Sequence, residues 1–148
     1  MKYNVFLIIS LLLGVVLTST SAQVPQSQTE RNKALVLEFW RVVFEAQNVE
    51  AATNYLAEDY IQHNPLAKTG RAGFVEFFSK IWEHPRPVAP TLRNPPELVI
   101  AEGDLVTLVW KRRLPEPADK TKTYEAFWFD VLRVKDGKLV EHWDCATK

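Results

Sequence analysis

The 148-residue chain carries 18 basic and 18 acidic residues, so its charge balance gives no reason to expect a polyanionic partner such as nucleic acid. Its single cysteine, Cys145, excludes an internal disulfide and a cysteine-based metal cluster. Stability must therefore come from the packing of a hydrophobic core.

The first 22 residues have the pattern of a secretory signal peptide. One basic residue precedes an almost unbroken apolar run over residues 5–17, and small residues follow it up to Ala22. The run is shorter than the about 20 residues that span a membrane, and the small residues favour cleavage after Ala22; an uncleaved anchor is the alternative. We therefore expect a secreted or periplasmic protein with no membrane contact after cleavage, a flexible leader over residues 23–28 and one domain over residues 29–148.

Two helices are predicted at the start of this domain. Residues 27–30 have the spacing of a capping box, and apolar positions then recur at intervals of three and four, which predicts a helix ending near Gln47. Asn48 can cap a second, shorter helix that runs to Leu56.

A short strand, a third helix and a connector follow. Residues 60–65 alternate and end at a proline, which is typical of a strand running into a loop. Residues 69–82 begin with Thr-Gly and carry a broad aromatic stripe, which predicts a helix packed on the core. Residues 84–96 hold five of the nine prolines and are expected to be irregular.

The pattern of the following residues predicts strands over 97–101 and 105–113 and a β-hairpin over 127–144. Helices followed by an antiparallel meander predict an α+β protein, with helices on one face of a curved sheet.

The turn of the hairpin is Asp136-Gly137, a pair that favours a left-handed backbone. As a two-residue turn, it would place Asp130 opposite Trp143. With Gly137 as a bulge residue, it pairs Asp130 with His142 and Trp128 with Asp144. We expect the bulged register, which collects one set of side chains on a single face: Trp128, Asp130, Leu132, Val140, His142 and Asp144. The other face then holds mainly Phe127, Phe129, Val131, Leu139 and Trp143.

The first of these faces is the candidate site. Two carboxylates and an imidazole among apolar neighbours are costly unless they bond to one another or to a ligand. The alternative is a solvated polar face, with the phenylalanine face as the core. In our interpretation the phenylalanine face is instead covered by a second copy in a homodimer.

Two segments together resemble the SnoaL-like polyketide cyclase group of the nuclear transport factor 2-like superfamily: residues 60–65 followed by an aromatic helix, and residues 136–144 at the end of the chain. The resemblance implies a cone-shaped curved antiparallel β-sheet, packed against three N-terminal helices and enclosing a pocket. Asn64 falls where related ketosteroid isomerases keep a carboxylate base, and Trp40 where they place a tyrosine donor. Both departures count against isomerase chemistry of that kind.

The resemblance implies a cofactor-independent lyase or isomerase that removes a proton next to the carbonyl of a small apolar compound, as in aldol-type closure. The alternative is a non-catalytic ligand-binding or dimerisation domain of the same fold. Asp130 is the expected base, and His142 would orient it or donate to the enolate. The candidate catalytic residues are Asp130, His142, Asp144 and His63. The candidate ligand-binding residues are Tyr60, Gln62, Asn64, Trp40, Trp128 and Trp82. No metal or organic cofactor is predicted, because His63, His84 and His142 lack any short ligand spacing.

Overall fold

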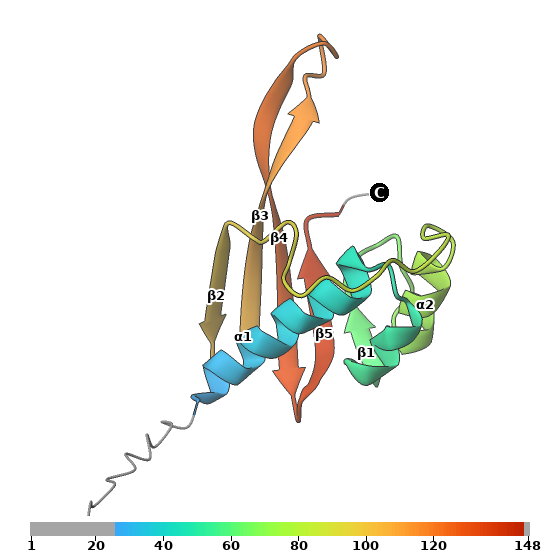
Figure 1. Cartoon of the computed structure of the whole chain (residues 1–148), viewed down its shortest axis with the longest axis vertical. Coiled ribbons are helices and arrows are strands. Elements are labelled where there is room, and N and C mark those ends of the chain that lie inside the picture. Colours follow the sequence, from blue (N-terminus) through green and yellow to red (C-terminus); the bar gives the residue numbers. More distant parts are fainter. Residues whose placement is uncertain (1–25, 147–148) are drawn as a thin grey trace, which may run out of the picture.

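A curved mixed sheet of five strands, in the order β1-β5-β4-β3-β2, forms the frame of the protein (Figure 1). The computed structural model describes residues 26–146, so the predicted signal peptide and residues 23–25 of the predicted leader lie outside the described residues. The strands are β1 (Leu56–Gln62), β2 (Leu98–Glu102), β3 (Leu105–Pro115), β4 (Thr123–Lys135) and β5 (Lys138–Asp144). The helices are α1 (Gln28–Phe39) and α2 (Arg71–Phe78), with a π-helix at Trp40–Glu45 and a 3₁₀ helix at Glu50–Asn54.

The predicted start of the first helix is confirmed, because Ser27 caps α1 by accepting a hydrogen bond at its Oγ from the backbone N–H of Glu30, at 3.2 Å. The helix continues as a π-helix to Glu45, close to the predicted end. The predicted second helix is only a 3₁₀ helix of five residues, and its N-cap residue is Val49 rather than the predicted Asn48, although Oδ1 of Asn48 accepts a hydrogen bond from the backbone N–H of Ala51 at 3.2 Å. It ends early because β1 begins at Leu56, and the carbonyl of Tyr55 just before it accepts a hydrogen bond from the N–H of Leu139. The described residues therefore contain two α-helices rather than three.

The sheet is mixed, whereas the sequence predicted an antiparallel one. Strands β2, β3, β4 and β5 form the expected antiparallel meander, but β1 pairs with β5 in parallel, with Gln62 opposite His142. Parallel neighbours need a long connection between them, and the chain from α2 to β4 supplies it. This pairing brings the segment after β1 to the end of β5, where the candidate site lies.

The hairpin has neither of the registers considered from the sequence. Asp136 and Gly137 both have positive φ, 51° and 72°, and form a two-residue turn with Lys135 opposite Lys138. Further along, Val134 lies opposite Leu139 and Arg133 opposite Glu141, so one additional residue, Val140, is inserted in β5 as a bulge.

This bulge places Asp130 opposite Asp144 and Leu132 opposite His142. The predicted pairs, Asp130 with His142 and Trp128 with Asp144, are wrong by two residues. A shift of two preserves the alternation of side chains, so Asp130, His142 and Asp144 still share a face. Leu139, assigned from the sequence to the opposite face, is fully buried in the core.

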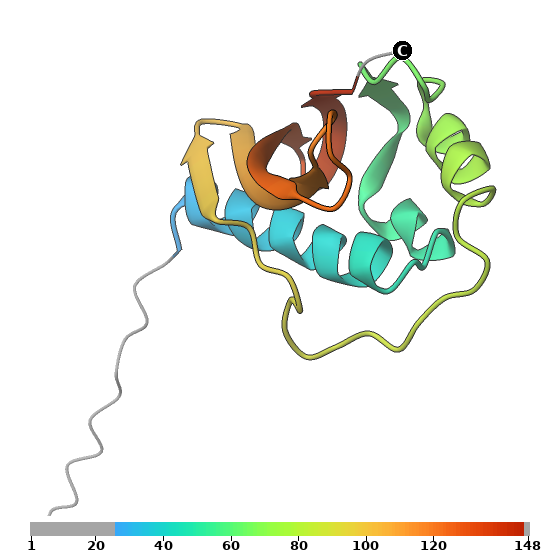
Figure 2. The same ribbon diagram turned by 90° about the horizontal axis from the view of Figure 1, so that it is seen from above.

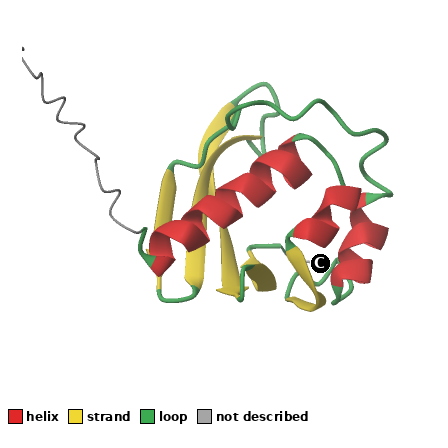
Figure 3. Cartoon of the chain, turned by 60° about the horizontal axis from the view of Figure 1, so that its bottom comes forward, coloured by secondary structure: helices red, strands yellow, loops and turns green. Residues whose placement is uncertain are grey.

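The core lies between the inner face of the sheet and the helices (Figure 2). In Figure 3 α1 crosses this face of the sheet, and the shorter helices stand beside β1. The fully buried side chains of this layer include Val36, Phe39 and Val43 from the first helical segment and Val106, Leu108, Leu132 and Leu139 from the sheet. On the outer face, Phe127 and Phe129 remain 51% and 45% exposed.

A connector without regular structure and an extended two-stranded arm complete the fold. The proline-rich connector predicted at residues 84–96 is confirmed as irregular, and in Figure 2 it runs around the end of the first helical segment. Strands β3 and β4 extend beyond the other strands as a two-stranded arm (Figure 1). Within residues 26–146, no helix is long and apolar enough to cross a membrane.

Gly73 offers a test of how tightly the loop before α2 is packed. A Cβ added there would overlap the backbone carbonyl of Lys68, whereas a Cβ at Gly137 would meet nothing within 4 Å. We expect Gly73→Ala to lower the free energy of unfolding by about 1–3 kcal/mol through overpacking, and Gly137→Ala by about 1 kcal/mol through backbone strain alone. Urea unfolding of both variants measures this, and an unchanged stability for Gly73→Ala would contradict the packing described.

Candidate functional site

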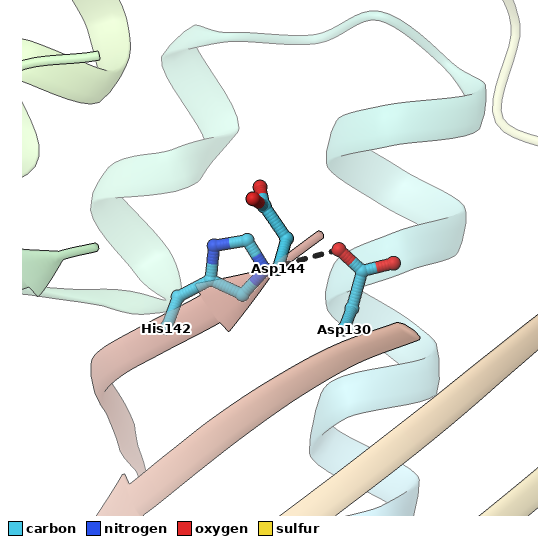
Figure 4. A group of neighbouring side chains, drawn as sticks. All are labelled: Asp130, His142 and Asp144. Atoms are coloured by element: carbon cyan, nitrogen blue, oxygen red, sulfur yellow. Dashed lines mark hydrogen bonds and ion pairs between the residues drawn. The ribbon is translucent and has the colours of Figure 1, made fainter. Parts of the chain in front are cut away.

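Asp130, His142 and Asp144 project from β4 and β5 on the inner face of the sheet (Figure 4). Nε2 of His142 lies 3.0 Å from Oδ1 of Asp130. The two residues are diagonal neighbours across the strands, because Asp130 lies opposite Asp144, two positions beyond His142. Such diagonal pairs are within reach of a long side chain such as imidazole. Asp130 is only 4% exposed and His142 only 6%, so the two side chains form a buried polar pair.

The other imidazole nitrogen is fixed by Gln62 at the end of β1. Nδ1 of His142 lies 3.0 Å from Oε1 of Gln62, and the same oxygen accepts a hydrogen bond from the backbone N–H of Asn64, also at 3.0 Å. A backbone N–H can only donate, so the Gln62 atom that it meets must be the carbonyl oxygen. Nδ1 of His142 must therefore carry a hydrogen.

This tautomer fixes the number of protons between His142 and Asp130. In a neutral imidazole with a hydrogen on Nδ1, Nε2 is an acceptor, and an ionised Asp130 would place two acceptors 3.0 Å apart. A hydrogen bond there requires one more proton, either on Asp130 or on Nε2 as an imidazolium. In both forms the pair has no net charge, which relieves the repulsion expected between Asp130 and the carboxylate of Asp144 opposite it.

The two oxygens of Asp130 differ in their surroundings. Oδ1 faces His142, whereas Oδ2 is buried and has no hydrogen-bond partner within residues 26–146. Both oxygens of Asp144 are satisfied, since Oδ2 accepts from Nδ2 of Asn64 at 2.7 Å and Oδ1 from the N–H of Ala146 at 2.8 Å. The unsatisfied acceptor of the cluster is therefore Oδ2 of Asp130, and a buried acceptor without a donor is costly.

These side chains line a pocket of about 170 Å³, here called the inner pocket. Its polar lining consists of Gln62, Asn64, Arg112, Asp130, His142 and Asp144. Its apolar lining consists of Trp40, Phe44, Ala67, Phe77, Phe78 and Trp128. A larger hollow of about 660 Å³ lies between the start of α1 and the turns of the two hairpins, but none of the three clustered residues lines it. We therefore place the candidate site in the smaller, chemically richer pocket.

The π-helix shapes the aromatic wall of this pocket. A π-helix closes i→i+5 hydrogen bonds, so its turn holds more residues than the 3.6 of an α-helix, and positions four apart come closer to alignment. Trp40 and Phe44 accordingly stack at 4.2 Å with an angle of 8° between their planes. Trp40 also stacks on Trp110 of β3, at 4.8 Å, which ties the wall to the sheet.

Seven of the ten residues predicted for the site line the inner pocket: Trp40, Gln62, Asn64, Trp128, Asp130, His142 and Asp144. The other three do not. His63 lies on the outer face, where its ring stacks on Trp143 at 5.0 Å and bonds to Glu141 at 2.8 Å. Adjacent residues of an extended chain point to opposite sides, so Gln62 and His63 cannot both face inward.

Tyr60 and Trp82 are core residues beside the pocket. Tyr60 is buried, and its hydroxyl accepts a hydrogen bond from Nε2 of Gln62. Burial and the nearby carboxylates of Asp144 and Asp130 raise the pKa of the Tyr60 hydroxyl, so it stays neutral and helps to hold Gln62. Trp82 stacks on Phe78 at 4.4 Å.

Two polar features of the pocket were not predicted from the sequence. Arg112 lies on β3 with its guanidinium 4.8 Å from the ring centre of Trp128. Gln62, predicted only as a ligand-binding residue, also fixes the tautomer of His142. The alternation of β3 could have indicated Arg112, because it follows the core position Trp110 by two residues.

Asp130, His142 and Asp144 each offer a ligand atom, and these atoms lie within 4.8 Å of one another, a donor set that suits a divalent cation. To bind such an ion, His142 would have to give up its hydrogen bond to Asp130. The absence of a metal cofactor stays a prediction.

The chain matches the SnoaL-like domain family model over residues 36–142 and belongs to this family, within the nuclear transport factor 2-like superfamily predicted from the sequence. No curated protein matches the chain significantly. A protein of Acidithiobacillus ferrooxidans assigned as a polyketide cyclase is similar in structure, with a TM-score of 0.56 and 21% identity over 80% of this chain and 89% of its own.

Two further solved structures have the same fold. A nuclear transport factor 2-like protein of unknown function from Burkholderia pseudomallei has a TM-score of 0.56 and 19% identity, over 79% of this chain and 91% of its own. TerC, crystallised with polyporic acid, has a TM-score of 0.56 and 20% identity, over 79% of this chain and 92% of its own.

The outer cluster around His63 gives a prediction for pH dependence. Hydrogen bonds from His63 and then from Arg133 hold the pKa of Glu141 below its usual range. A carboxyl group with a lowered folded pKa stabilises the protein fully above its unfolded pKa, and this contribution is lost as the pH falls through the folded value. Glu141→Gln should therefore destabilise the protein at neutral pH, and the difference from wild type should disappear in acid. Urea unfolding over a pH series measures this, and a pH-independent difference would contradict it.

Proposed function

We propose that this SnoaL-like protein is a cofactor-independent lyase or isomerase that removes a proton next to the carbonyl of a small, largely apolar compound. The observation that carries the proposal is Oδ2 of Asp130, a buried acceptor without a partner in the described chain, in a residue that lines the inner pocket. A buried acceptor that no protein donor occupies is available to take a proton from a ligand.

The reaction begins from the form with an imidazolium at His142 and a carboxylate at Asp130. Oδ2 of Asp130 takes the proton from the carbon next to the carbonyl, while Oδ1 keeps its hydrogen bond to Nε2 of His142. The electron pair of the broken C–H bond moves to the substrate oxygen as an enolate, whose charge is balanced by the imidazolium. Asp130 then returns the proton to another carbon, or, in an aldol closure, the enolate carbon attacks a second carbonyl, whose π electrons move to its oxygen as an alkoxide that takes the proton back from Asp130.

Gln62 is a positioning residue in this scheme. By accepting from Nδ1 of His142, it keeps the ring oriented so that Nε2 faces Asp130. Asn64 holds Gln62 through its backbone and Asp144 through its side chain. Asn64, which falls where related ketosteroid isomerases keep their carboxylate base, therefore has a structural role in this scheme. The base of the proposed reaction is Asp130, on β4.

The inner pocket limits the size of the substrate. About 170 Å³ corresponds to about five or six water molecules at about 30 Å³ each, whereas pockets for drug-sized ligands measure about 300–1,000 Å³. The reacting part of the substrate is therefore a fragment about the size of one ring. TerC, which shares the fold, was crystallised with polyporic acid, and this small organic compound with a protein of the same fold supports the proposal.

A second candidate function, non-catalytic ligand binding, is favoured by the hydrogen bonds that already occupy Asp144 and one oxygen of Asp130. The two functions differ in what Asp130 does. A binding protein needs only the shape and polarity of the pocket, which an amide at position 130 preserves.

We further propose that the protein is exported through its first 22 residues and acts as a homodimer in its secreted or periplasmic location. The exposed Phe127 and Phe129 on the outer face support the dimer, because such a patch is costly to leave in water. Sedimentation of the mature protein at micromolar concentration should give a dimer, and a Phe127→Asp, Phe129→Asp variant should sediment as a monomer. A monomeric wild type would contradict this assembly.

Asp130→Asn tests the catalytic role. The amide can still bond to Nε2 of His142, so we expect the free energy of unfolding to change by less than about 1 kcal/mol, while turnover falls about 10²-fold to 10⁴-fold. Deuterium exchange of the protons next to the carbonyl of phenylacetone or acetophenone in D₂O, followed by NMR, measures the reaction without knowledge of the natural substrate.

Asp59→Asn is the matched control, because Asp59 is exposed on β1. It should exchange the protons as fast as wild type. Catalysed exchange that persists in Asp130→Asn would remove Asp130 from the mechanism, and wild-type protein with no catalysed exchange would favour the binding function.

A further inference from the structure

We propose that Arg112 binds an anionic group on the ligand, so that the ligand class is an aromatic carboxylate or a similar planar anion. This inference rests on the proposed function only in placing the ligand in the same inner pocket.

Arg112 stands where two cavities meet. It lines the inner pocket and also a second hollow of about 400 Å³ on the outside, here called the outer hollow. Trp40 and Phe44 line both cavities as well. A ligand that fills the inner pocket and extends past these three side chains therefore passes the guanidinium of Arg112.

The charge of Arg112 is not used by the protein itself. Within residues 26–146, no carboxylate forms an ion pair with the guanidinium of Arg112 and no group accepts a hydrogen bond from that guanidinium. Its neighbour Lys111 pairs with Glu125 at 2.9 Å. Glu45, the acidic residue of the outer hollow, accepts hydrogen bonds from the backbone N–H groups of Arg93 and Asn94. Arg112 is thus the cation with free donors at this junction.

Stacking against Trp128 holds the guanidinium in position. The guanidinium carbon lies 4.8 Å from the centre of the Trp128 ring, a cation–π distance. A guanidinium that stacks by its face keeps its N–H donors at the edge, where they can bind a carboxylate with two parallel hydrogen bonds. Trp110, which also lines the outer hollow, has a buried indole N–H without an acceptor in the described chain.

The remaining lining selects for a flat ligand. Trp40, Phe44, Phe77, Phe78 and Trp128 surround the inner pocket with aromatic faces, which favour stacking on a planar ring. The two features together describe a ring in the inner pocket with an anionic group at its mouth. The positive charge also offsets the negative charge of Asp144, which would otherwise repel such a ligand.

The test compares matched acids and amides: benzoate with benzamide, and 2-naphthoate with 2-naphthamide. Because Trp40 and Trp128 line the pocket, quenching of tryptophan fluorescence reports binding. We expect wild-type protein to bind at least one acid about tenfold more tightly than its amide, as a charge-assisted hydrogen bond predicts. Arg112→Gln should bind the acid and its amide with equal affinity.

Arg113→Gln is the matched control, because Arg113 follows on β3 and points to the opposite face. It should keep the preference for the acid. Asp130→Asn should also keep this preference even if exchange activity is lost or was never present, which separates this inference from the proposed reaction. Equal binding of acid and amide by wild type, no binding of either, or an unchanged preference in Arg112→Gln would overturn the assignment.

Discussion

The hydrogen bond between the backbone N–H of Asn64 and Oε1 of Gln62 is the constraint on which the site depends. A backbone donor cannot reverse its role, so it fixes which end of the Gln62 amide faces His142. That orientation places a hydrogen on Nδ1 of His142 and turns Nε2 toward Asp130. The backbone N–H of Asn64, just after β1, thereby determines how many protons the buried pair of Asp130 and His142 carries.

The parallel pairing of β1 with β5 makes this arrangement possible. It sets Gln62 beside His142, and the N–H of His63 bonds to the carbonyl of His142 at 3.0 Å. The chain then turns so that Asn64 reaches both Gln62 and Asp144. Sheet topology and site chemistry are therefore linked, since a β1 paired in the opposite direction would carry Asn64 away from the end of β5.

The sequence was enough to predict most of the residues that form the site, but not how they pair across the strands. Alternation along β5 puts His142 and Asp144 on one face, and the extra residue Val140 shifts the register by one so that Asp130 of β4 joins them there. The position of the bulge leaves no mark in the turn sequence, so the pairs across the hairpin were wrong. His63 was predicted to face the pocket, but its neighbour Gln62 takes the inward position. Which of the two faces inward depends on the pairing of β1 with β5, a contact between segments distant in sequence.

The proposed chemistry requires that His142 carries a hydrogen on Nδ1 and shares one more proton with Asp130. Nitrogen-15 NMR of the imidazole side chains measures this directly, with the exposed His84 as an internal reference for a histidine in water. We expect a protonated Nδ1 at His142, held by Gln62, and loss of that fixed tautomer in Gln62→Leu. An unprotonated Nδ1 at His142 in wild-type protein would contradict it.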